Sequence, residues 1–129
     1  MGYYTLKEIL SSHASAWATE AVRYRRGLSH SPDTADAFWF GMCSAFEDST
    51  DELLELLHTP TVQGVFTFIQ ALELRRNVAD QFLARLTDEL LLYAYTLGVA
   101  EAYKTCVEYL TDALIEQMLS VNTRVEYPS

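Results

Sequence analysis

The sequence predicts an all-α protein, a compact helical bundle of four to five helices whose C-terminal helices are long. Half of its 129 residues are apolar, which is too many for a disordered chain. Five Gly and three Pro are too few for the turns of an all-β domain. Apolar residues recur at helical spacing along most of the chain. We expect one helical domain over residues 1–119 and a loose, aperiodic tail over 120–129.

The first helix is predicted between Leu6 and Arg26. Thr5 and Glu8 have the spacing of a capping box, in which each satisfies a backbone N–H at a helix start. Gly27 suits the C-terminal cap of the same helix.

A second helix is predicted after Ser31 and Pro32, which suit an N-cap and a first-turn proline. Ser49 with Glu52 forms another capping box, so a new short helix is expected to begin there. Thr59, followed by proline, is expected to start the next helix.

The chain after residue 60 is predicted to form one or two long helices, because as far as residue 119 it has no proline and only Gly64 and Gly98. The best position for a break is near Thr87. This residue suits an N-cap, and Asp88 and Glu89 would then complement the helix dipole in the first turn.

A heptad seam is predicted in the last helix, where small and apolar residues repeat at coiled-coil spacing. Its members, the candidate interface residues, are Leu92, Tyr95, Val99, Ala102, Cys106, Tyr109 and Ala113. Small side chains in such a seam let a partner helix come close. Further apolar residues lie off the seam, and one small bundle cannot cover them all. We therefore expect a homodimer or a protein partner.

The charge is acidic and uneven. The net charge is −9, and all of it arises after residue 46. With Lys7 and Lys104 as its only lysines, the chain has little to offer a phosphate backbone, so no direct nucleic-acid binding is expected. The candidate acidic surface consists of Glu73, Asp80, Asp88, Glu89, Glu101, Glu108, Asp112 and Glu116.

A cytoplasmic location without membrane contact is expected. The start of the chain lacks the basic segment and apolar core of a signal peptide. The longest apolar stretch, Leu90 to Ala100, is well below the roughly 20 residues of a membrane span. Cys43 and Cys106 belong to no metal or redox motif, which fits a reducing compartment.

One acidic pattern suggests metal chemistry. Asp51, Glu52 and Glu55, followed by Asn77 and Asp80, resemble the paired carboxylate motifs of the all-helical nucleoside triphosphate pyrophosphohydrolases. The resemblance implies a Mg²⁺-dependent hydrolase with Glu52, Glu55 and Asp80 as ligands. The chain departs from the motif at Asp51, where Glu is expected, and at Asn77, which replaces an acid. A solvated acidic helix face explains the same residues, so no metal is our primary expectation.

Other motifs are incomplete. Glu55 and His58 form one Glu-x-x-His unit, whereas helical di-iron sites need two. Arg25 and His30 have the spacing of the HEPN ribonuclease motif, but Gly27 between them is expected to end the helix. We therefore expect no catalytic residue and no cofactor.

A longer resemblance covers three segments: TEAVR at 19–23, AFWFGMCS at 37–44 and LRRNVADQF at 74–82. Their order is similar to that of segments in the small helical Rubisco assembly chaperones, which are dimers that clasp a client peptide. The resemblance implies a helical dimer that works by holding another protein.

The leading hypothesis is a non-enzymatic protein-interaction protein, such as an inhibitor, adaptor or assembly chaperone, that docks through apolar helix faces and its acidic second half. A sharper version is a phage-type inhibitor that occupies the basic groove of a nucleic-acid-binding defence enzyme. One alternative is the Mg²⁺-dependent pyrophosphohydrolase. Another is a small-molecule-binding bundle with its ligand between Trp17 and Trp39.

Overall fold

The structure, a computed structural model, describes residues 5–28, 33–86 and 88–126 and contains four helices: α1 Leu6–Arg26, α2 Thr34–Leu56, α3 Val62–Leu83 and α4 Leu90–Glu126. The described residues form no strand. The predicted all-α bundle with a long C-terminal helix is confirmed, and it has four helices.

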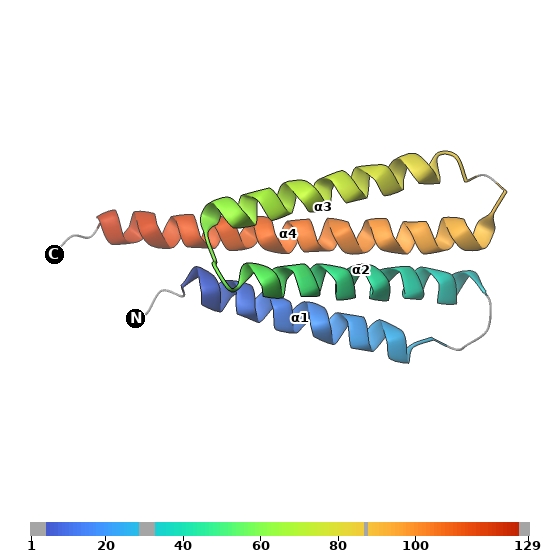
Figure 1. The fold of residues 1–129 in the computed structure, drawn as a ribbon, viewed down its shortest axis with the longest axis horizontal. Helices are drawn as coiled ribbons and strands as arrows, with labels where there is room; N and C mark the ends of the chain where they lie inside the picture. Colours follow the sequence, from blue (N-terminus) through green and yellow to red (C-terminus); the bar gives the residue numbers. More distant parts are fainter. Residues whose placement is uncertain (1–4, 29–32, 87, 127–129) are drawn as a thin grey trace.

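The four helices lie side by side in the order α3, α4, α2 and α1. α1 and α3 run in one direction and α2 and α4 in the other, so the central neighbours α2 and α4 are parallel (Figure 1). Although α3 follows α2 in sequence, it packs chiefly against α4. α1 packs chiefly on α2 and has a smaller contact with α4. The C-terminal end of α4 extends beyond the other three helices (Figure 1). The pair α2 and α4 is therefore the centre of the bundle.

The helix starts follow the capping rules, with two shifts from the predicted positions. Thr5 accepts a hydrogen bond from the Glu8 backbone N–H at 3.2 Å, as the first capping box predicts. Asp33 caps α2, while the expected Ser31 and Pro32 lie outside the described residues. Thr61 caps α3, so the predicted start at Thr59 is wrong.

The predicted helix start at Ser49 is also wrong, because α2 continues through it without a break. Ser49 is completely buried beside Cys106 of α4, and its hydroxyl has no hydrogen-bond partner among the described residues. Glu52 forms an ion pair with Arg75 of α3. Both side chains are used in contacts between helices, and this packing overrides a local capping signal.

The second half divides near the predicted position. α3 ends at Leu83 and α4 begins at Leu90, so the break brackets Thr87, which itself lies outside the described residues. α4 continues to Glu126, which extends the helix past the expected boundary at residue 119. No helix in the described part of the chain combines the length and apolar character that a bilayer span requires.

α2 and α4 touch through their backbones at two glycines. A Cβ atom on Gly98 would lie 2.1 Å from the Phe38 carbonyl oxygen, and one on Gly41 would lie 2.1 Å from the Tyr95 carbonyl oxygen. Ala45, one turn after Gly41 on α2, is also buried. The absence of side chains at these two positions lets the central helices approach this closely.

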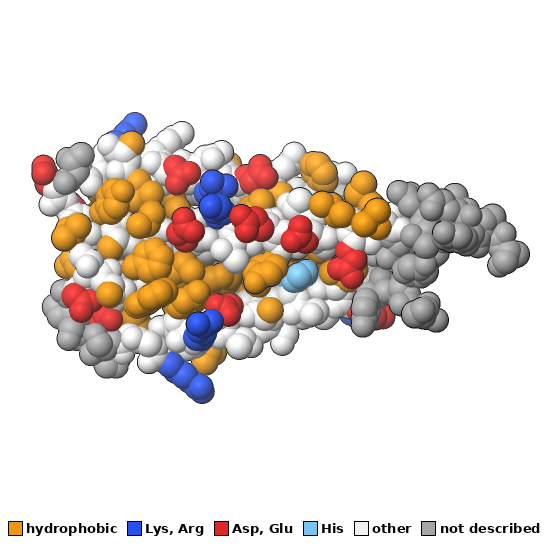
Figure 2. Space-filling model, turned by 180° about the vertical axis from the view of Figure 1, so that it is seen from behind, with side chains coloured by type: hydrophobic (Ala, Val, Ile, Leu, Met, Phe, Trp, Pro, Cys, Tyr) orange, Lys and Arg blue, Asp and Glu red, His pale blue; other side chains and the backbone are white. Residues whose placement is uncertain are grey.

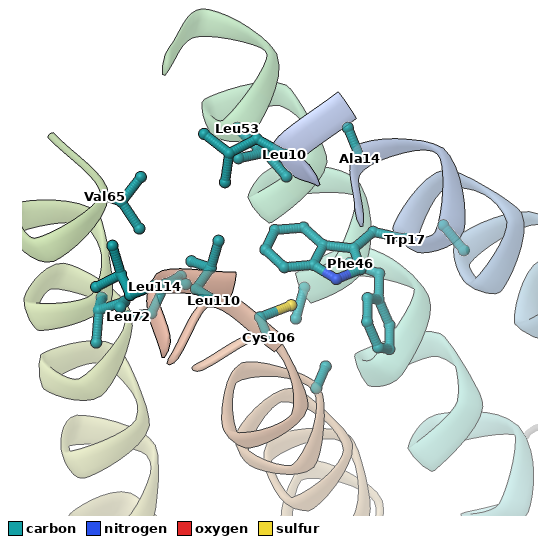
Figure 3. Packing of buried hydrophobic residues seen from close by; sticks show 14 of the residues in the cluster. Leu10, Ala14, Trp17, Phe46, Leu53, Val65, Leu72, Cys106, Leu110 and Leu114 are labelled. Atoms are coloured by element: carbon teal, nitrogen blue, oxygen red, sulfur yellow. The ribbon is translucent and has the colours of Figure 1, made fainter. Parts of the chain in front are cut away.

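The hydrophobic core lies where all four helices meet (Figure 3). Its largest completely buried side chains are Trp17, Phe46, Leu10, Leu53, Leu72 and Leu110. The Trp17 ring points from α1 into the bundle near Phe46 (Figure 3) and lies 6.4 Å from the Phe68 ring of α3, measured between centroids. Trp17 therefore links the two outer helices across the core.

Candidate interaction surface

The heptad seam predicted on α4 is largely occupied within the chain. Ala102, Cys106 and Ala113 have no exposed surface. Tyr95 and Val99 are partly buried, and the Gly41 backbone of α2 packs directly on them. Only two seam members have substantially exposed side chains, Leu92 at 43% and Tyr109 at 39%. The small residues do receive a close helix, but that helix is α2 of the same chain.

An aromatic track crosses the face between α1 and α4. We define it as Trp39, Tyr24, Tyr109 and His13. Trp39 stacks on Tyr24 with ring centroids 5.3 Å apart, and Tyr109 lies 5.4 Å from His13. No ring contact among the described residues joins Tyr24 to Tyr109, so the track consists of two aromatic pairs. Trp39 and Tyr109 remain 38% and 39% exposed, so the track offers aromatic surface to the exterior.

Each end of the aromatic track opens into a hollow. Beside Trp39, a hollow of about 190 Å³ is lined by Arg23, Tyr24, Gly27 and Trp39. Beside His13, a hollow of about 370 Å³ is lined by Glu8, Ile9, Ser12, His13 and Glu116. The first is therefore aromatic with an arginine at its edge, and the second has two carboxylates.

An acidic line on α4 borders the track. It consists of Glu101, Glu108, Asp112 and Glu116, whose spacing of seven, four and four residues places them on one helix face. All four are exposed, and none forms an ion pair with a described residue. Figure 2 shows acidic side chains along the upper edge of a band of hydrophobic side chains at the level of α4 and α1.

The other predicted acidic residues lie elsewhere. Glu73 and Asp80 belong to α3. The Asp80 carboxylate oxygen Oδ2 lies 3.9 Å from Nε of Arg76. Asp88 and Glu89 precede α4. The structure thus gathers half of the candidate acidic surface into one line and leaves the other half dispersed.

His13 connects the track with the acidic line. Burial lowers the pKa of His13 below its usual 6.5, although the carboxylates of Glu116 and Asp112 act in the opposite direction. The loss of hydration on this face therefore outweighs the attraction of two nearby negative charges.

Replacement of Glu116 by glutamine is expected to lower the pKa of His13 further, because it removes the larger of the two charge effects that favour the imidazolium. Since the folded state binds fewer protons at His13 than the unfolded state, protonation below about pH 6.5 should reduce the free energy of unfolding. NMR titration of the imidazole in both proteins measures the shift. Glu101→Gln, at the far end of the acidic line, is the control, and an unchanged or raised pKa in Glu116→Gln would contradict the contact.

The carboxylates proposed for Mg²⁺ are engaged differently. Both oxygens of Glu52 accept hydrogen bonds from the Arg75 guanidinium, one at 2.6 Å. Arg75 also lies 6.0 Å from the centre of the Tyr103 ring. Asp80 pairs with Arg76. Among the described residues, no group of three or more His, Cys, Asp or Glu side chains could hold a metal ion. A site built from Glu52, Glu55 and Asp80 does not fit this arrangement.

The remaining chemical candidates are also separated. Cys106 is completely buried, which raises its pKa to about 12 and leaves it protonated at neutral pH. Arg25 bonds to Glu47, and His30 lies outside the described residues. Trp17 is buried in the core, whereas Trp39 borders a surface hollow, so the two do not line one ligand pocket.

The eight acidic residues predicted from the sequence include the four of the acidic line, whereas the aromatic track was not predicted. His13 and Tyr24 stand at core-facing spacing in α1, yet both are only partly buried. Their aromatic character at the edge of an apolar stripe was the available signal.

In comparisons with known proteins, no family model, no curated protein and no solved structure matches the chain.

Proposed function

We propose that this protein functions by binding another protein through the face between α1 and α4, without catalysing a reaction. The observation that carries the proposal is the aromatic track, in which Trp39 and Tyr109 remain more than one third exposed. Tryptophan and tyrosine are enriched among the residues that dominate binding energy, because they bury a large rigid surface. An exposed aromatic surface of this composition is typical of an interface.

The acidic line supports the same function and narrows the class. Charged residues around an apolar centre accelerate association and select the partner. An inhibitor, an adaptor and an assembly chaperone all work in this manner. Among inhibitors, one that occupies the basic groove of a nucleic-acid-binding enzyme fits the acidic line best, because the two charges are opposite.

Affinity capture from the native host tests the proposal. It compares the tagged wild type with the double variant Trp39→Ala/Tyr109→Ala. The wild type is expected to retain one protein in stoichiometric amount. The double variant should retain at least about tenfold less, because truncation of a single central aromatic typically costs that much binding.

The matched control is Leu74→Ser, which changes an α3 side chain that is 64% exposed and lies outside the track. It should capture the partner as the wild type does, and thermal melting should show that all three proteins are folded. Capture that survives the double variant, or that depends on Leu74 instead, would contradict the assignment of this face.

A further inference from the structure

We infer that the aromatic track receives a basic amphipathic helix of the partner protein. This inference rests on the proposed function. The apolar side of that helix lies on Trp39 and Tyr109, and its lysines or arginines face the acidic line of α4.

The acidic line carries four carboxylates and only one neighbouring cation of α4, Lys104. Elsewhere the chain pairs acids with arginines, as Glu47 with Arg25 and Glu52 with Arg75. Along the acidic line, by contrast, the described residues provide no ion pair, and Lys104 is the one basic residue of α4 between Glu101 and Glu116. Complementary cations must then come from the partner.

The same charge argues against other occupants. A second copy would bring an identical acidic line and a net charge of −9 to the face. Nucleic acids and anionic membrane surfaces would be repelled as well. A basic polypeptide is the occupant whose charge is opposite to that of the acidic line.

The length of the surface suits a helix. From Glu101 to Glu116 the acidic line extends about 22 Å along α4, the length of roughly fifteen helical residues. Cations that recur every four and seven residues on a facing helix would match its spacing.

The two hollows differ in the side chain that each would take. The hollow at His13 has Glu8 and Glu116 on its wall, so a lysine or arginine suits it. The hollow at Trp39 is aromatic and has Arg23 at its edge, so an uncharged apolar side chain suits it. The bound helix should therefore place its more basic end at His13.

The probe is a fluorescein-labelled peptide of about sixteen residues, with leucine at the a and d heptad positions and lysine elsewhere. A matched peptide has glutamate in place of every lysine. Because Trp17 is completely buried, collisional quenching by acrylamide reports on Trp39. The lysine peptide should bind, protect Trp39 from acrylamide and dissociate as salt rises from about 0.05 M to about 0.5 M. The glutamate peptide should do none of these.

Two triple variants with the same charge change locate the interaction. Glu108→Gln/Asp112→Asn/Glu116→Gln neutralises the acidic line and should weaken binding of the lysine peptide about tenfold. The control, Asp48→Asn/Asp51→Asn/Glu55→Gln, neutralises exposed carboxylates of α2 and should change binding less than about twofold. Circular dichroism establishes that both are folded.

Three outcomes would overturn the inference. The two peptides could bind equally, the two triple variants could weaken binding equally, or the lysine peptide could fail to bind and leave Trp39 unprotected. Self-association that shields Trp39 would also overturn it, in favour of a second copy. The experiments distinguish the proposed function from this inference. If capture of the partner depends on Trp39 and Tyr109 but not on the acidic line, the proposed function stands and the basic helix is refuted. A partner independent of Trp39 and Tyr109 removes both.

Discussion

Replacement of Gly98 by alanine is expected to lower the free energy of unfolding by about 3 kcal/mol or more. The new Cβ would stand 2.1 Å from the Phe38 carbonyl oxygen, and that atom belongs to the α2 backbone, which cannot rotate away. α2 and α4 would have to separate along the central contact of the bundle. Helix propensity alone predicts the opposite sign, because alanine is favoured over glycine by roughly 1 kcal/mol within a helix.

Urea denaturation followed by circular dichroism measures this effect, and Gly41→Ala should change stability in the same direction because its Cβ would meet the Tyr95 carbonyl oxygen. Gly27→Ala is the matched control. Its backbone is right-handed, and its Cβ would meet nothing nearer than 3.5 Å, so stability should stay within about 0.5 kcal/mol. A Gly98→Ala protein as stable as the wild type would refute the close crossing of α2 and α4.

The sequence predicts those features of the fold that depend on local signals. The first helix has the predicted bounds because Thr5 and Gly27 act on the backbone within one turn. Ser49 carries an equally good local signal, yet it lies inside α2, because its side chain is buried against α4. The two cases differ only in a contact between distant segments, and capping rules do not contain that information.

The surface shows the same limit. Helix periodicity alone aligns Glu108, Asp112 and Glu116, so the acidic line was within reach of the sequence. The aromatic track combines two pairs from different helices, Trp39 of α2 with Tyr24 of α1 and Tyr109 of α4 with His13 of α1, and these pairs exist only once the helices have packed. Likewise, the small residues of the heptad seam indicated a close helix without identifying it as α2.

The second large effect is expected at Trp17, where alanine should lower the free energy of unfolding by about 4 kcal/mol. Trp17 is completely buried. Its ring lies near Phe46 of α2 (Figure 3) and forms a ring contact with Phe68 of α3. Its removal would leave a cavity where all four helices meet, and close-packed neighbours fill such a cavity only in part. Chemical denaturation monitored by circular dichroism measures the loss.

Trp17→Phe separates packing from hydrogen bonding at this position. The indole Nε1 of Trp17 is buried and has no hydrogen-bond partner among the described residues, so it adds a desolvation cost without a compensating bond. Phenylalanine removes that polar group and retains much of the ring, so its loss of stability should be about 1 to 2 kcal/mol, well below that of alanine. Equal losses for the two variants would mean that the nitrogen and not the ring volume matters, and Trp17 would then need a hydrogen-bond partner rather than a close-packed core.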